Sequence, residues 1–219
     1  DKVRIATKLP HYLIKSLDTL ERLFNEQLKR LRTDYIDYYL MHMLTDVDTW
    51  NRLKALGIEQ WLEEKKASGA IRQIGFSYHG NSEVFCRLLD AYDWDFCQIQ
   101  MNYVDWRHAK EVNKRNLDAK YLYDELTRRK IPVAIMEPLL GGSLAKYNYA
   151  VAKELTHLDP EATPAKWAFR FCGSHANVMT VLSGMTFEEH IKENVETFSP
   201  LKVCSAKEFE ALERAAKAY

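Results

Sequence analysis

The chain has 219 residues, enough for one large core or two small ones, and its 31 lysines and arginines balance its 31 aspartates and glutamates. This balance argues against a nucleic-acid partner or an anionic membrane surface, and no apolar run reaches the length of a membrane span. The four cysteines are widely spaced and the first ten residues lack a signal-peptide pattern, so we expect no metal or dithiol site and a soluble, cytoplasmic protein.

The first part of the chain predicts two strands separated by a helix. Residues 2–7 form a strand candidate that ends at Lys8. Residues 16–31 begin with a serine suited to cap a helix, and their apolar side chains recur at helical spacing. Residues 35–41 are apolar on both faces, which predicts a strand buried on both sides, and His42 stands at its carboxyl end.

The middle of the chain continues the alternation. Residues 50–68 predict a helix that is interrupted near Gly57. Strands are predicted over 71–76 and 96–101, because these stretches are apolar and rich in β-formers. The second of these strands is followed by Asn102-Tyr103 and then by a predicted polar loop, with Trp106, Arg107 and His108, that is long enough to have a function of its own.

A helix is predicted over 117–130, and the rest of the chain predicts two more strands, over 132–137 and 178–182. Thr163 followed by Pro164 is a strong helix start, since proline at the first turn lacks only a hydrogen bond that would be missing anyway.

Two further helix starts are predicted from the same four-residue pattern. Thr186 with Glu189, and Ser205 with Glu208, each have the spacing of a capping box, in which side chains and backbone N–H groups satisfy one another.

Six strands, each followed by a helix, indicate an α/β fold built from βα units with right-handed crossovers. A doubly wound open sheet competes, but its nucleotide-binding form carries a G-x-G-x-x-G string that is absent here. The prediction is a single domain over 1–219, an incomplete (β/α)8 TIM barrel with strands 3 to 8 present. Because the chain begins almost directly with a strand, we expect the first two units to precede Asp1.

Polar residues stand at or just beyond all six predicted strand ends: Lys8, His42, Ser77, Gln98 or Gln100, Glu137 and Ser183. In a barrel these ends share one face, where the chemistry of such folds is found. Each residue alone has a plainer explanation, since His42 could simply bond to nearby backbone. Taken together, the set predicts an active site at the carboxyl face.

Five strings, in order, resemble the aldo-keto reductase family: Ala-Thr-Lys at 6–8, the stretch from Leu31 to His42, Ile71 to Ser77, Met136 to Gly142, and Val181 to Met185 with Glu193-Asn194. The resemblance covers the chain from the third barrel strand onward. It is closest to bacterial members that often carry a carboxyl-terminal iron-sulfur tail, but without closely spaced cysteines no cluster is predicted.

The resemblance implies a catalytic tetrad of aspartate, tyrosine, lysine and histidine. Lys8 matches the lysine, whose charge lowers the pKa of the tyrosine so that the phenol can protonate an alkoxide. His42 matches the histidine, which orients the carbonyl. The aspartate and tyrosine are expected in the two units before Asp1.

The resemblance also implies cofactor contacts. Ser77 and Gln98 match residues that bond the nicotinamide carboxamide, whereas Tyr78 replaces a family asparagine. Further matches follow the last two strands: Met136, Glu137, Leu139, Gly141, Gly142, Ser183, Gly184, Met185 and Asn194. Gly184 and His190 stand where relatives place cations for the 2′-phosphate. The sequence itself therefore does not distinguish NADPH from NADH. NADPH is expected only because the family commonly uses it, and NADH is not excluded. Gly141 and Gly142 have an alternative interpretation as a simple turn.

The predicted function is NAD(P)H-dependent reduction of a small aldehyde or ketone by hydride transfer. The alternative is a catalytically silent homologue that binds nucleotide as a regulatory or scaffold subunit. The sequence does not identify the carbonyl substrate or the oligomeric state.

Overall fold

Parallel strands β1 (Ala6–Leu9), β2 (Ile36–Met41) and β3 (Ile71–Tyr78) frame the first of two units, Asp1–Gln98. The computed structural model describes residues 3–80, 82–112, 118–146 and 149–219. The three strands pair in chain order, with Lys8 opposite Leu40 and Leu40 opposite Gly75. Strand β4 (Phe96–Gln100) contains the last residues of this unit and the first residues of the second, Ile99–Tyr219.

The helices of the first unit are η1 (His11–Leu13), α1 (Leu17–Leu31), α2 (Val47–Ala55), α3 (Ile58–Ala67) and α4 (Ser82–Leu89). The Ser16 hydroxyl accepts a hydrogen bond from the Thr19 N–H at 3.2 Å and so caps α1, as predicted. Gly57, with φ of 89°, turns the chain between α2 and α3, which explains why one helical pattern gives two helices.

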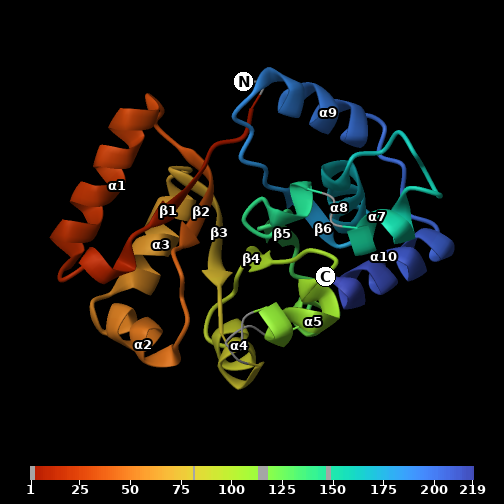
Figure 1. The fold of residues 1–219 in the computed structure, drawn as a ribbon. Helices are drawn as coiled ribbons and strands as arrows, with labels where there is room; N and C mark the ends of the chain where they lie inside the picture. Colours follow the sequence, from red (N-terminus) through yellow and green to blue (C-terminus); the bar gives the residue numbers. More distant parts are fainter. Residues whose placement is uncertain (1–2, 81, 113–117, 147–148) are drawn as a thin grey trace. The chain divides into compact units, whose positions relative to one another are not determined.

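One face of these strands packs against α1 and α3, which Figure 1 shows beside them. The Tyr39 ring lies edge-on to Phe24 of α1 at 5.3 Å between centroids and also contacts Trp61 of α3. Because side chains alternate along a strand, Leu40 points to the opposite face. The unit therefore has an aromatic core between its strands and helices α1 and α3. Leu40 belongs to the opposite face of the strands.

The second unit contains strands β5 (Val133–Met136) and β6 (Val178–Val181), which pair in parallel. Its helices are α5 (Asp105–Val112), α6 (Ala119–Arg128), η2 (Ser143–Ala145), α7 (Tyr149–Leu155), α8 (Pro164–Gly173), α9 (Glu188–Phe198) and α10 (Ala206–Ala218). The Met101 N–H, directly after β4, donates to the Met136 carbonyl at 3.1 Å. The strands follow one another in chain order, which is the order that consecutive βα units produce.

A buried ion pair joins α8 to α10 in this unit. Arg170, 1% exposed, donates to Glu208 at 2.8 Å and to the Lys202 carbonyl at 2.9 Å, and its guanidinium lies over the Trp167 ring. The predicted capping box of Ser205 and Glu208 is present, so Glu208 serves both the helix start and the ion pair. The Thr163 cap with proline at the first turn is likewise confirmed.

Three predictions about local structure are wrong. The first strand is Ala6–Leu9, later than 2–7, and residues 1–2 lie outside the described residues. Helix α5 replaces the predicted polar loop, because the Asn102 side chain accepts from the N–H groups of Val104 and Asp105 and starts the helix. At α9 no capping box forms: Phe187 is the N-cap, and the Thr186 N–H donates to His190.

Other boundaries differ by a few residues. Strand β3 continues two residues beyond its predicted end, and residue 117, the predicted start of the helix that becomes α6, lies outside the described residues. Among the residues that the structure describes, none of the helices has the length and apolarity needed to cross a membrane.

Candidate active site

Lys8 and His42 lie on the same face of the first unit. Lys8 is paired with Leu40, and His42 is two residues beyond Leu40 on the same strand path, so all three project away from the helix side where Tyr39 packs. The His42 N–H donates to the Leu9 carbonyl at 3.2 Å, which continues the pairing of β1 and β2 past the end of β2. The two predicted catalytic residues are thus brought together at adjacent strand ends.

The electrostatics of this pair favour a neutral imidazole. Burial lowers the pKa of His42, and electrostatic interactions with Lys8 and His11 lower it further. Burial also lowers the pKa of Lys8. A histidine with a pKa below its usual 6.5 is uncharged at pH 7, and it can then donate one N–H and accept at the other nitrogen.

His11 and Tyr12 are neighbours of this pair that the sequence reasoning missed. The His11 side chain is 8% exposed, and its Nε2 lies 3.4 Å from the Met43 carbonyl oxygen. The Tyr12 ring lies 5.9 Å from the His11 ring and 6.4 Å from the His42 ring, centroid to centroid. The signal available in the sequence was Pro10, which ends the strand and turns η1 over the end of β2.

Ser77 belongs to the same face as Lys8 and His42. It lies two residues beyond Gly75, which pairs with Leu40, and it is 1% exposed. The Ser77 hydroxyl accepts a hydrogen bond from the Met43 N–H at 2.9 Å and so holds the segment after His42. Its own O–H remains a donor, because this bond uses only the oxygen.

Gln98, 3% exposed, also projects to this face. It lies two residues beyond Phe96 on β4 and therefore on the same face as Phe96, whose ring would contact a Cβ added at Gly75 on the Lys8 side of the strands. Tyr78 is different. Its ring is 1% exposed and packs 4.7 Å from Phe85 on the helix side, so the structure does not bring it together with the others.

In the second unit, the predicted residues after β5 form a closed turn. Glu137 has a φ of 54°, and its carboxylate accepts from the Gly141 N–H at 2.6 Å. The Gly142 N–H donates to the Leu139 carbonyl at 3.0 Å. Gly141 and Gly142 have φ of 63° and 88°, values that favour glycine. The structure therefore supports the turn interpretation of these glycines, with Met136 directly before the turn.

The predicted residues after β6 meet the start of α9. The Asn194 amide donates to the Ser183 hydroxyl at 3.0 Å, and His190 accepts from the Thr186 N–H at 3.3 Å. Met185 is 47% exposed, and a Cβ added at Gly184 would meet no atom within 4 Å. Among the residues described here, no group of three or more histidine, cysteine or carboxylate side chains is arranged to hold a metal.

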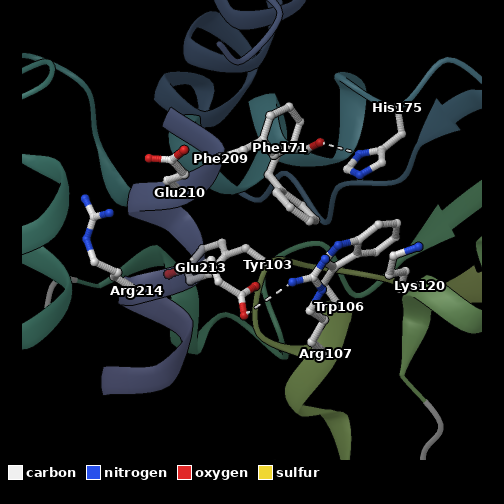
Figure 2. A pocket seen from close by; sticks show the side chains of 10 residues that line it. All are labelled: Tyr103, Trp106, Arg107, Lys120, Phe171, His175, Phe209, Glu210, Glu213 and Arg214. Atoms are coloured by element: carbon white, nitrogen blue, oxygen red, sulfur yellow. Dashed lines mark hydrogen bonds and ion pairs between the residues drawn. The ribbon is translucent and has the colours of Figure 1, made fainter. Parts of the chain in front are cut away.

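A cavity of about 600 Å³ in the second unit contains none of the predicted site residues. Figure 2 shows aromatic side chains from α5, α8 and α10 around it. The His175 ring, 4.6 Å from that of Trp106, bonds through Nδ1 to the Phe171 carbonyl, and burial lowers its pKa. The charged groups at the rim mostly pair with other side chains, as Arg214 does with Glu154 and Lys120 with Asp124. We assign no function to this cavity.

Comparison with known proteins places these residues in context. The model of the Aldo/keto reductase family matches residues 1–217. An aldo-keto reductase of Bacillus halodurans (holo form) is 22% identical with a TM-score of 0.71, over 99% of this chain and 73% of that chain. An aldo/keto reductase of Klebsiella pneumoniae in complex with NADP and acetate is 21% identical with a TM-score of 0.72, over 97% and 69%. One from Brucella melitensis is 19% identical with a TM-score of 0.71, over 97% and 73%.

A search of curated protein sequences found no match. The structural similarity confirms the predicted α/β fold of six parallel strands as part of a TIM barrel.

Proposed function

The chain belongs to the aldo/keto reductase family, and on that premise we propose that it transfers hydride from NADPH to the carbonyl carbon of a small aldehyde or ketone. The family supports NAD(P)H-dependent carbonyl reduction in general. The choice of NADPH follows the Klebsiella pneumoniae relatives, whose structures contain NADP and NADPH. No disulfide joins any of the four cysteines, which fits a cytoplasmic location.

The observation that carries the proposal is the placement of Lys8 and His42 at adjacent strand ends on one face. A neutral His42 can donate its N–H to the carbonyl oxygen and hold it in place as negative charge develops there. The Lys8 ammonium, on the same face, stabilises that charge electrostatically. The same positive charge lowers the pKa of His42, so Lys8 also helps to keep the imidazole neutral.

Ser77 and Gln98 have the chemistry needed to hold a carboxamide. Both are buried and project to the face of Lys8 and His42, and they offer a hydroxyl and a primary amide. When bound, the nicotinamide supplies the hydride. We propose that Ser77 and Gln98 fix the orientation of its ring by bonding its amide group.

We propose that the backbone of the turn from Glu137 to Gly142 forms part of the wall of the cofactor site. Its Gly141 and Gly142 N–H groups already bond to Glu137 and Leu139, so contact with a pyrophosphate requires other donors or an exchange of these bonds. Ser183, Gly184, Met185, His190 and Asn194 are proposed for the adenosine half. Gly184 and His190 stand where relatives often have lysine and arginine for a 2′-phosphate.

The alternative of a silent, nucleotide-binding homologue is favoured by one observation. Tyr78, in the position of the family asparagine, is packed in the core and removes one contact to the carboxamide. Consumption of bound cofactor in the presence of a carbonyl substrate distinguishes the two functions, because only the reductase would consume it.

The test is to titrate the intact natural protein with NADPH and with NADH while following the fluorescence of its tryptophans, five of which are in this chain. We expect saturable quenching, followed by consumption of the bound cofactor when an aldehyde is added. Absence of binding for both cofactors would refute the proposed function. Binding without consumption, over a panel of aldehydes and ketones, would favour the silent homologue.

A further inference from the structure

A buried carboxyl group lies directly after β4 in the second unit. Asp105, the first residue of α5, is 1% exposed, and its Oδ2 accepts from the Gln100 amide at 2.8 Å and from the Asn102 amide at 2.7 Å. Its Oδ1 is buried and has no hydrogen-bond partner among the described residues. Burial raises the pKa of Asp105, while the two amide bonds oppose this. Such a group costs stability, and the fold alone does not explain it.

Asn102 connects this carboxyl group to the end of β5. It is completely buried, and its Oδ1 accepts from the N–H groups of Val104 and Asp105 at 3.0 and 2.8 Å. The Oδ1 contacts fix the orientation of the amide. Its Nδ2 must therefore face the other way, where it donates to Asp105 Oδ2 and to the Glu137 carbonyl at 3.1 Å.

Glu137 is where the chain leaves β5 in a left-handed conformation, with φ of 54°. For a residue with a side chain this conformation is unfavourable and persists only when its surroundings hold it. Its carbonyl also accepts from the Leu140 N–H at 3.0 Å, and its carboxylate accepts from the Gly141 N–H. A continuous series of hydrogen bonds thus runs from Asp105 through Asn102 to the turn of residues 137–142.

We propose that Asp105 is a positioning residue for this turn, acting through Asn102 to hold Glu137 in the conformation that shapes the cofactor site. The inference rests on the proposed function, because the turn matters for cofactor binding only if the protein binds a dinucleotide. Asp105 itself need not touch the cofactor. Its role is to accept one Nδ2 hydrogen of Asn102 and so hold in place the amide whose other Nδ2 hydrogen reaches the Glu137 carbonyl.

The test compares Asp105→Ala with Asp105→Asn and Asn102→Ala. The first removes the acceptor, whereas the amide oxygen of Asp105→Asn can still accept. We expect Asp105→Ala and Asn102→Ala each to raise the Kd for NADPH about tenfold, and Asp105→Asn to stay within about twofold of wild type. The double variant should lose no more than either single one, because both act along one series of bonds.

A second measurement does not require cofactor: hydrogen exchange of the backbone amides of residues 139–144. Asp105→Ala should accelerate exchange at Leu140 and Gly141, whose N–H groups bond to Glu137. Glu208→Gln is the control, since it weakens a buried pair elsewhere in the second unit and should leave this exchange unchanged.

Unchanged exchange in a folded Asp105→Ala protein would overturn the inference, as would an equal effect of Glu208→Gln. If the wild type binds neither dinucleotide, the proposed function fails. The coupling of Asp105 to the turn would still be decided by the exchange data.

Discussion

The charge of Lys8 influences the pKa of His42, and this influence can be measured on the unliganded protein. The pKa of His42 is lowered by burial, by Lys8 and by His11. Lys8→Met removes one positive charge and leaves burial in place, so we expect the pKa of His42 to rise. An NMR titration of the histidine ring protons measures this shift.

His175 is the internal control for that titration, because burial is the main cause of its lowered pKa and Lys8 does not contribute. An unchanged His42 pKa in Lys8→Met would mean that the two side chains do not share a site. If catalysis requires neutral His42, the acid limb of the pH–rate profile lies below pH 6.5 in the wild type. It should move to higher pH in the variant.

Gly75 is a residue whose lack of a side chain is required by packing. A Cβ at this position would lie 2.5 Å from the Phe96 carbonyl oxygen and 2.8 Å from ring carbons of Phe96. We expect Gly75→Ala to reduce the free energy of unfolding by about 2–3 kcal/mol, because backbone cannot yield cheaply. Urea denaturation measures the loss, and Gly184→Ala, where the added Cβ meets open space, should change it by less than about 0.5 kcal/mol.

At the scale of elements, two helix starts with the same sequence pattern behave differently. Ser205 and Glu208 form a complete capping box on α10, whereas Thr186 and Glu189 form none on α9. Ser205→Ala should therefore cost about 1 kcal/mol of stability, and Thr186→Ala should cost almost nothing. Thermal unfolding of the two variants checks this; equal losses would show that both serve as caps.

The same pair shows what could be predicted for the elements. Caps at Ser16, Thr163 and Ser205 and the break at Gly57 follow from local chemistry, and all were predicted correctly. Helix α5 was missed although its start is local: the Asn102 side chain accepts from the N–H groups two and three residues further on, as an N-cap residue does. Asn102 had been interpreted only as the residue that follows a strand.

At the scale of the whole chain, buried carboxylates make the free energy of unfolding depend on pH. In the first unit, burial would raise the pKa of Asp37, but hydrogen bonds from the Ile5 N–H, Arg4 and Arg72 outweigh it and hold the pKa below its ordinary 3.8. Asp37 therefore contributes stability above pH 4, and this contribution is lost as the pH falls through the lowered pKa. In the second unit, the lowered pKa of Glu208 acts in the same direction.

We expect the urea concentration at the unfolding midpoint to decrease when the pH is lowered below 4. Asp37→Asn should be less stable than the wild type at pH 7, but its stability should change less with acid. Asp105, whose pKa burial raises, acts in the opposite direction and favours the folded chain at low pH. An acid profile of Asp37→Asn parallel to that of the wild type would contradict this assignment.

The fold as a whole was more predictable than the site. The rhythm of strands and helices gave the α/β barrel class, and strand ends located Lys8, His42, Ser77 and Gln98 on one face. Tyr78 could not be placed, because β3 continues through it and alternation then sends its ring into the core. The hydrogen bonds that close the turn after Glu137 likewise depend on backbone conformation, which composition does not reveal.

The distribution of thiols has a practical consequence. Cys97, Cys172 and Cys204 are buried, and burial raises the pKa of each, so they react slowly with alkylating reagents. Cys86, on α4, is partly exposed. A maleimide dye should therefore label the native protein at one position, giving a fluorescent reporter without any engineered cysteine.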